Sequence, residues 1–261
     1  MDLGLNGKRA LVLGSSQGIG AEIARVLARE GCNVYVGARR LDHIQSLADE
    51  LSEEFNVDAK AYSIDLSDGI SVEKLCEMIT HEWKIDILLN NAGGPPPSSS
   101  TGVSDEIWES SLQSLLMSTI RLSEAAVKGM RERGWGRILT VASSGVIQPI
   151  PNLAVSNTVR SAVVGFTKTL SNEVAKDGIT VNMVLPGRID TERLASIHEA
   201  SANKQGMTYE EFRDNSRSSI PARRFGNVKE FAEVAVFLMS VCASYITGSV
   251  IRVDGGVIQS V

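Results

Sequence analysis

Short apolar runs and longer amphipathic stretches alternate along the whole chain. Runs of about four to eight apolar residues are typical of strands buried on both faces of a sheet. Apolar positions three or four residues apart predict helices with one buried face. We predict strands at 10–13, 33–38, 59–64, 85–90, 137–142, 180–185 and 249–253, and helices at 21–30, 41–55, 71–83, 105–131, 155–175 and 228–239.

This alternation predicts an α/β fold with a mostly parallel, doubly wound sheet and helices on both faces. One stretch, 186–222, breaks the rhythm with mixed polar sequence. A long insertion after the carboxyl end of a strand is typical of a substrate lid. Because no linker or internal repeat interrupts the remaining sequence, we predict a single domain over residues 1–261.

The first predicted strand runs into Gly-Ser-Ser-Gln-Gly-Ile-Gly at 14–20, and a helix follows. A helix N-terminus offers unpaired N–H groups and the positive end of the helix dipole, which suit a phosphate. Gly14 permits a sharp turn, Gly18 permits close approach of a pyrophosphate, and Gly20 permits tight packing of the helix on its strand. A plain glycine-rich turn is the other interpretation, and the Gly-Lys-Ser/Thr ending of a P-loop is not present in the sequence.

Composition narrows the classes of function. The chain is 43 % hydrophobic and 22 % charged, which is ordinary for a soluble globular protein. The net charge of −5 argues against nucleic-acid and anionic-membrane partners. The sequence has neither an apolar run of about 18 residues nor a signal peptide, so we expect a cytoplasmic protein. Its three cysteines and three histidines lack disulfide and metal-ligand spacing, so we expect no metal site.

Several short motifs occur in a fixed order along the chain. They are the glycine turn at 14–20, Asn-Asn-Ala-Gly at 90–93, Ser143, Asn-Met-Val-Leu-Pro-Gly at 182–187, Tyr-Ile-Thr-Gly at 245–248 and Asp-Gly-Gly at 254–256. Each motif alone is a weak signal, but in this order and spacing the chain resembles the short-chain dehydrogenase/reductase family over nearly its whole length. The resemblance implies a seven-stranded Rossmann-type sheet that binds NAD or NADP at the carboxyl ends of its strands.

The resemblance also assigns cofactor contacts residue by residue. It places Gly14, Ser16, Gly18, Ile19 and Gly20 at the phosphates, Asp65 and Leu66 at the adenine, Asn91, Ala92 and Gly93 at the ribose, and Pro186, Gly187, Ile189 and Thr191 at the nicotinamide. For Asp65, an ordinary strand-end turn is the alternative role.

The end of the second predicted strand indicates which dinucleotide is bound. An acidic residue there would bind the 2′-hydroxyl of NAD, but this chain has Ala38 followed by Arg39 and Arg40. Two arginines suit a 2′-phosphate, so we predict that NADP(H) is preferred over NAD(H). A solvated basic turn is the alternative. The missing acid also disfavours a Rossmann methyltransferase.

The catalytic motif departs from the family. The family uses Asn, Ser, Tyr and Lys, and the aligned positions here hold Leu115, Ser143, Ser156 and Arg160. A tyrosine with a depressed pKa exchanges a proton as hydride moves, which a serine hydroxyl cannot do without an adjacent base. Arg160 stays cationic and can bind ribose hydroxyls or the cofactor, but it cannot relay a proton. Ser143 alone retains the family's residue type.

Two functions of different classes follow. The first is an NAD(P)-dependent oxidoreductase with a rearranged site, acting on a small carbonyl or alcohol substrate such as a 3-oxoacyl compound. Ser143 would bind the substrate oxygen, and water, Ser156 or a lid residue such as His198 or Tyr209 would deliver the proton. The second is a catalytically impaired dinucleotide-binding protein that acts as a sensor or assembly partner.

Two helices are expected to mediate self-association. The predicted helices at 105–130 and 155–175 carry apolar residues on more faces than one sheet can cover. In the family that the chain resembles, the corresponding helices pair between subunits, and symmetric dimers and tetramers are common among soluble oligomers. We therefore predict a homotetramer or a homodimer.

Overall fold

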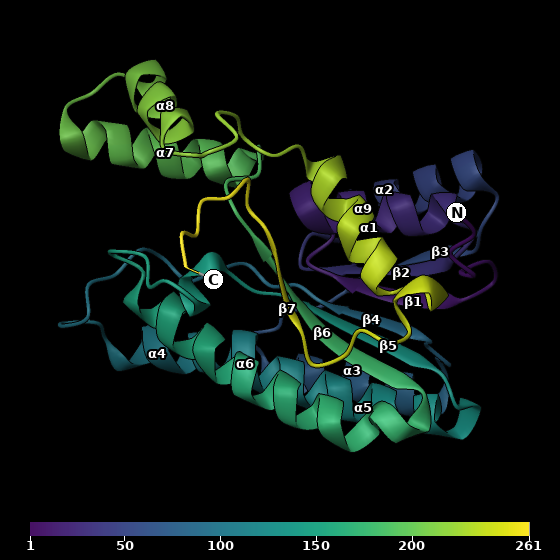
Figure 1. Ribbon diagram of the computed structural model, residues 1–261. Helices are drawn as coiled ribbons and strands as arrows, with labels where there is room; N and C mark the ends of the chain where they lie inside the picture. The colour runs from purple at the N-terminus through teal and green to yellow at the C-terminus, as the bar shows by residue number, and fades with distance from the viewer. Residues whose placement is uncertain (261) are drawn as a thin grey trace.

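A seven-stranded sheet forms the centre of the computed structural model, which describes residues 1–260 (Figure 1). The strand order is β3-β2-β1-β4-β5-β6-β7, and every neighbouring pair is parallel. The strands are β1 Arg9–Leu13, β2 Asn33–Ala38, β3 Ala59–Ser63, β4 Ile87–Asn90, β5 Gly136–Val141, β6 Ile179–Pro186 and β7 Val250–Val253. The predicted seven strands and doubly wound class are confirmed, and the sheet is wholly rather than mostly parallel.

Helices cover both faces of this sheet. The helices are α1 Gly18–Arg29, α2 Leu41–Phe55, α3 Gly69–His81, α4 Asp105–Ser111, α5 Ser118–Arg133, α6 Ala154–Val174, α7 Glu192–Gln205, α8 Tyr209–Ser218 and α9 Val228–Leu238. Val12 of β1 packs in one core cluster with α1, α2 and α9, whereas Leu11 and Leu13 pack in the other with α3, α5 and α6. Burial on both faces explains why the central strands β4, β5 and β6 are rich in apolar residues.

The predicted helix at 105–131 is interrupted. A π-helical segment, Leu112–Met117, separates α4 from α5. The hydroxyls of Ser118 and Thr119 donate to the carbonyl oxygens of Ser114 and Leu115, at 2.6 and 2.7 Å, and so compete with the backbone ladder. Helical periodicity alone does not reveal such a bulge, which contains the buried Leu115.

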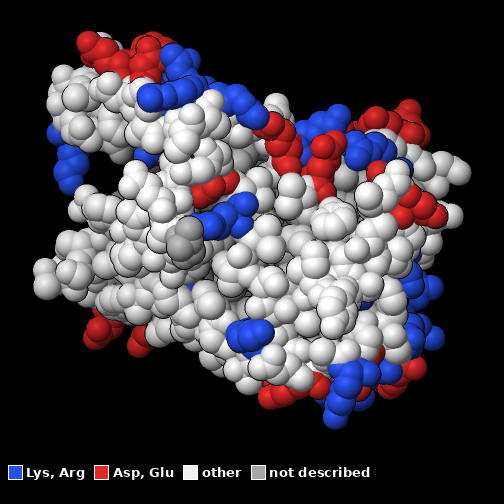
Figure 2. Space-filling view, in the orientation of Figure 1, with Lys and Arg blue, Asp and Glu red and all other residues white. Residues whose placement is uncertain are grey.

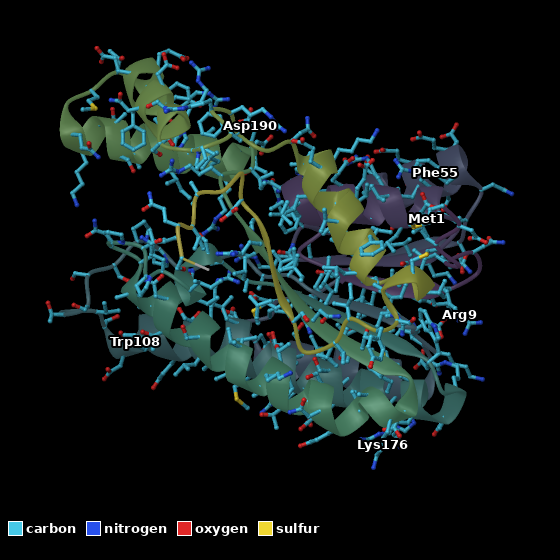
Figure 3. All side chains as sticks on the ribbon, in the orientation of Figure 1. Met1, Arg9, Phe55, Trp108, Lys176 and Asp190 are labelled. Carbon is cyan, nitrogen blue, oxygen red and sulfur yellow. The ribbon has the colours of Figure 1, made fainter. Side chains whose placement is uncertain are left out.

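The stretch predicted as a lid folds into α7 and α8, which stand over the carboxyl ends of the strands (Figure 1). Arg213 pairs with Asp190 at 2.9 Å, and Arg188 donates to the carbonyl oxygen of Ser216 at 2.6 Å. Figure 3 places Asp190 at the base of this two-helix unit. These polar contacts join α8 to the segment that leaves β6.

The visible surface carries basic and acidic side chains in scattered groups (Figure 2). A notch in the outline separates the two-helix unit from the body below, and Lys and Arg side chains border it. Within residues 1–260, no helix is both long and apolar enough to cross a membrane, and no cluster of potential metal ligands occurs.

The close packing of α1 on β1 can be tested at Gly20. A β-carbon there would overlap the carbonyl oxygen of Gly14 and lie 2.8 Å from Nδ2 of Asn91. We expect Gly20→Ala to lower the free energy of unfolding by about 1–3 kcal/mol in urea titrations. In the control Gly69→Ala, the new carbon meets no atom closer than 3.7 Å. That control should leave stability unchanged or raise it by up to about 1 kcal/mol. Equal effects of the two changes would contradict this packing.

Candidate cofactor and catalytic site

The glycine turn provides an open anion-binding end on α1. Gly14 and Gly18 both have φ of 61°, in the left-handed region that favours glycine. The Asn91 side chain donates to the Gly14 carbonyl at 3.2 Å and fixes the turn to the end of β4. Within the described residues, the Gln17 side chain makes no cap bond to the helix, so the first-turn N–H groups can bind a phosphate. The turn therefore fits the dinucleotide that the sequence predicts.

The predicted adenosine side is electrostatically mixed. Arg39 and Arg40 are exposed at the end of β2, and Arg40 donates to Oε1 of Gln17 beside the glycine turn. Asp65 accepts bonds from the Ser67 hydroxyl at 2.7 Å and the Ser67 N–H at 2.9 Å. The Ser67 hydroxyl is the main cause that lowers the pKa of Asp65, so this carboxylate stays ionised as an acceptor.

The predicted nicotinamide side lies against the same turn. A β-carbon at Gly18 would lie 3.5 Å from the methyl group of Thr191. Thr191 caps α7 by accepting the Leu194 N–H at 3.2 Å, and Ile189 is buried. A β-carbon at Gly187 would lie 2.5 Å from the Asp254 Cα. The structure thus brings the segments at 14–20 and 186–191 together, as the resemblance predicts.

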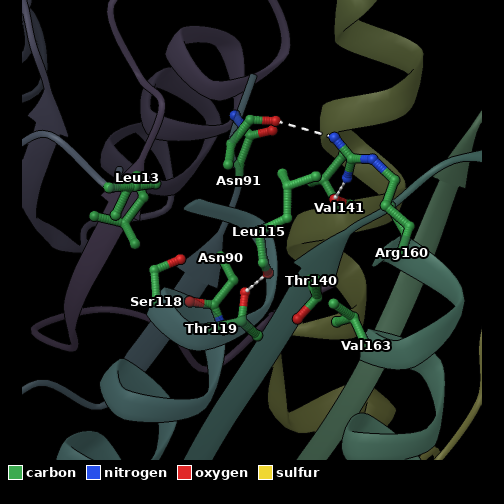
Figure 4. Close-up of a pocket in the computed structure, with 13 residues that line it drawn as sticks. Leu13, Asn90, Asn91, Leu115, Ser118, Thr119, Thr140, Val141, Arg160 and Val163 are labelled. Atoms are coloured by element: carbon green, nitrogen blue, oxygen red, sulfur yellow. Dashed lines mark hydrogen bonds between the residues drawn. The ribbon is translucent and has the colours of Figure 1, made fainter. Parts of the chain in front are cut away.

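Arg160 occupies the carboxyl edge between β4 and β5. Its side chain donates to the carbonyl oxygens of Val141 at 3.0 Å and Ala92 at 3.2 Å (Figure 4). Arg160 is 9 % exposed, and desolvation, followed by repulsion from Arg193, lowers its pKa to about 10. The guanidinium remains charged at neutral pH. Part of its donor capacity is used on the backbone, which the sequence did not indicate.

Two serines occupy the other polar positions of the altered motif. Oγ of Ser143 accepts the Gly145 N–H at 3.1 Å, which leaves the Ser143 proton available to a substrate oxygen. Ser156 lies one helical turn before Arg160 and is mostly buried. Its hydroxyl makes no hydrogen bond with any other described residue. Ser143 is therefore an oriented donor, whereas Ser156 has no base beside it.

Leu115 makes the third replaced position apolar. It is buried and forms a cluster with Val155 and Val159 of α6. A small cavity of about 10 Å³ lies beside it, large enough for about one water molecule (Figure 4). Asn90, which also lines this cavity, donates to Oγ of Ser123 at 3.2 Å, and its buried Oδ1 has no partner among residues 1–260.

Two residues near the site, Asn157 and Arg193, were not predicted from the sequence. Asn157 donates to the Ile150 carbonyl at 2.9 Å, and a β-carbon at Gly145 would overlap its Oδ1. Asn157 thus holds the loop that follows Ser143 against α6. Arg193 reaches Gly94 from α7. The only feature of the sequence that could have indicated Arg193 is its position two residues after Thr191.

The two suggested lid donors lie in contacts within the lid itself. His198 is buried, its ring centroid lies 5.4 Å from that of Phe212, and its Nε2 lies 3.1 Å from Oγ of Ser216. Burial is the main cause that lowers the pKa of His198, so the ring is neutral near pH 7. The Tyr209 hydroxyl accepts from Arg213 at 3.1 Å. Neither side chain meets Ser143 here, which removes the basis for the expectation that one of them delivers the proton.

Comparison with known proteins identifies the class. Residues 14–258 match the family model described as enoyl-(acyl carrier protein) reductase. The chain is 34 % identical over 257 residues to the 3-oxoacyl-[acyl-carrier-protein] reductase FabG of Vibrio cholerae, covering 97 % of this chain and 98 % of that one. The chain belongs to the short-chain dehydrogenase/reductase family.

Solved structures agree with this assignment. L-sorbose reductase from Gluconobacter frateurii, complexed with NADPH and L-sorbose, superposes with a TM-score of 0.94 at 34 % identity and full coverage of both chains. A variant of actinorhodin polyketide ketoreductase with NADPH gives 0.89 at 34 % identity, over 96 % of this chain and 97 % of that chain. The relatives are NAD(P)-dependent reductases, and this chain is an oxidoreductase of that short-chain type.

Arg160 can be tested by truncation. We expect Arg160→Ala to weaken NADP(H) binding roughly ten- to a hundredfold, because loss of a hydrogen bond from a charged donor costs about 1.5–3 kcal/mol. It should also lower the unfolding free energy, since a buried and a half-buried hydrogen bond to backbone carbonyls are lost. Calorimetric titration and urea unfolding measure the two effects. The exposed Arg131, paired with Asp177, provides the control Arg131→Ala, which should change neither quantity appreciably. Unchanged NADP(H) affinity in Arg160→Ala would remove the cofactor role.

Proposed function

We propose that the protein is an NADP(H)-dependent dehydrogenase/reductase that interconverts a small carbonyl compound and its alcohol through a rearranged catalytic site. One observation carries the proposal. The Ser143 hydroxyl is held by the Gly145 N–H with its proton free, at the same sheet edge as a glycine turn open to a dinucleotide. A protein that had lost its catalytic activity would not need to keep the Ser143 hydroxyl oriented in this way.

Preference for NADP(H) is supported from two sides. Arg39 and Arg40 follow β2 where an NAD enzyme would hold an acid, and both are exposed to a ligand. The L-sorbose reductase and the actinorhodin ketoreductase, both similar to this chain, are described with NADPH. NAD(H) is the second candidate and should bind more weakly.

The proposed reaction assigns a task to each nearby group. When bound, NADPH supplies a hydride to the carbonyl carbon. Ser143 donates a hydrogen bond to the carbonyl oxygen and so orients it. The buried charge of Arg160 stabilises the negative charge that develops on that oxygen. Water completes the alcohol by giving a proton to the oxygen, because Ser156 has no adjacent acid or base and the guanidinium keeps its proton.

The second candidate function is a dinucleotide-binding protein without hydride chemistry, acting as a sensor or assembly partner. A specific observation favours it: Arg160 binds two backbone carbonyls, and Leu115 makes the neighbouring position apolar. Those contacts suit a structural role equally well. Turnover measurements therefore decide between the two functions.

Two further properties complete the proposal. The unit of α7 and α8 acts as a substrate lid over the carboxyl ends of the strands. Two features support this role: the unit stands over that edge of the sheet, and Thr191 at its beginning lies against Gly18 of the glycine turn. The protein assembles as a homotetramer or a homodimer through α5 and α6. The symmetry of the family supports this assembly. The apolar surface expected on these helices is small, because the exposed residues of α5 are all charged and Phe166 and Val164 of α6 are partly buried.

Cofactor preference gives a direct test. We expect NADPH to bind at least tenfold more tightly than NADH, and Arg39→Ala to remove most of that difference by weakening NADPH alone. Fluorescence titration of both cofactors measures this. The control Lys60→Ala removes an exposed charge from β3 and should change neither affinity. Tighter binding of NADH than of NADPH by the unaltered protein would contradict the preference.

The catalytic assignment has its own test. We expect Ser143→Ala to lower kcat for carbonyl reduction roughly ten- to a hundredfold and to leave the Kd of NADPH within about twofold. The double variant Ser156→Tyr with Arg160→Lys restores the family pair. On the rearranged-site proposal it should abolish the native reaction, whereas on the alternative function it should create reductase activity in an inactive protein. Steady-state assays of both variants with a carbonyl panel distinguish these outcomes.

A further inference from the structure

Two guanidinium groups converge on one point at the edge of the site. A β-carbon at Gly94 would lie 2.7 Å from Nη2 of Arg193 and 3.7 Å from Nη2 of Arg160. The two arginines come from different elements, α6 and α7. Repulsion from Arg193 contributes to the lowered pKa of Arg160. Such an approach of like charges costs free energy unless an anion lies between them.

No anion from the protein is there. Over residues 1–260, no carboxylate lies within 4.0 Å of either guanidinium, although the chain has more acidic than basic residues. Arg137 offers a contrast, because its buried side chain donates to the carbonyl oxygens of Ser240, Gly136 and Gly178. Arg193 has no hydrogen-bond partner within the described part of the chain. Its donors are free for a ligand.

The position of Arg160 and Arg193 favours binding of the substrate over binding of the cofactor. Arg160 is fixed beside Val141, two residues before Ser143, and beside Ala92. Arg193 lies in the first turn of α7, whose N-terminal dipole adds to the positive potential. Arg193 is exposed, so a ligand that enters from solvent beneath α7 and α8 can contact its guanidinium. The diphosphate of a dinucleotide has its own site at the glycine turn.

We propose that Arg160 and Arg193 together bind a carboxylate of the substrate. The inference rests on the proposed function and narrows its substrate class to oxo acids and the matching hydroxy acids. Planar guanidinium groups match the two oxygens of a carboxylate and bind them with charge-assisted hydrogen bonds. Binding the carboxylate between the two cations also holds the carbonyl of the same molecule near Ser143.

Paired ligands that differ only in charge test the proposal. The probes are 2-oxopentanoate, 4-oxopentanoate and 5-oxohexanoate, each beside its methyl ester, titrated calorimetrically into the protein saturated with NADP⁺. We expect at least one acid to bind tenfold or more tightly than its ester. Arg193→Gln should remove that difference by weakening the acid alone, while the Kd of NADPH stays within about twofold.

Lys204→Gln is the matched control, because it removes one positive charge from the far end of the same helix. It should leave the acid-to-ester ratio unchanged. The proposal is overturned if the esters bind as tightly as the acids, or if no acid binds at millimolar concentration. It is also overturned if Arg193→Gln weakens NADPH without changing the ratio, which would assign Arg193 to the cofactor diphosphate. Acid binding as expected without any hydride transfer would contradict the proposed function and leave the carboxylate site standing.

Discussion

A charged guanidinium buried between two strand ends is the constraint on which the site depends. Burial of an unpaired charge costs several kcal/mol, so Arg160 needs partners where it lies. The carbonyls of Val141 and Ala92 provide them, and in doing so join the carboxyl ends of β5 and β4. The side chains around the guanidinium must therefore leave space for it and must not replace these two carbonyls as its hydrogen-bond acceptors.

The other replaced positions fit this constraint. Ser156 is much smaller than a tyrosine, lies one turn before Arg160 on α6 and is buried. Leu115 lies in the π-helical segment, packs with Val155 and Val159 and has no acceptor to offer the cation. Leu115 and Arg160 line the same small cavity, so these two departures from the family motif lie side by side. Ser143 is held separately by the Gly145 N–H, and this explains how an oriented hydroxyl remains in an altered site.

Local sequence signals predicted most of the fold. Apolar runs located β1, β4, β5 and β6 because these strands are buried on both faces, whereas the edge strands β3 and β7 are only partly buried. The glycine turn marked the end of β1. Ile85 was included in β4, although the strand begins at Ile87. Periodicity missed the π-helical segment because its apolar positions continue those of the flanking helices.

The candidate site was predictable only in part. The cofactor segments could be located because they are short motifs on consecutive residues. The bonds from Arg160 to two carbonyls, and its approach to Arg193, join residues that are distant in sequence. No local pattern encodes such contacts. For the same reason, His198 was a reasonable proton donor by composition, yet it lies in the lid's own core beside Phe212.

On the proposed function, hydride transfer proceeds here without the family's tyrosine. The most direct measurement supplies NADPH carrying deuterium at one face of the nicotinamide C4, together with an oxo-acid panel, and follows the product by mass spectrometry. We expect deuterium at the carbinol carbon from one of the two labelled faces only, incorporated roughly ten- to a hundredfold more slowly in Ser143→Ala. Tight NADPH binding with no deuterium in any product would contradict the claim.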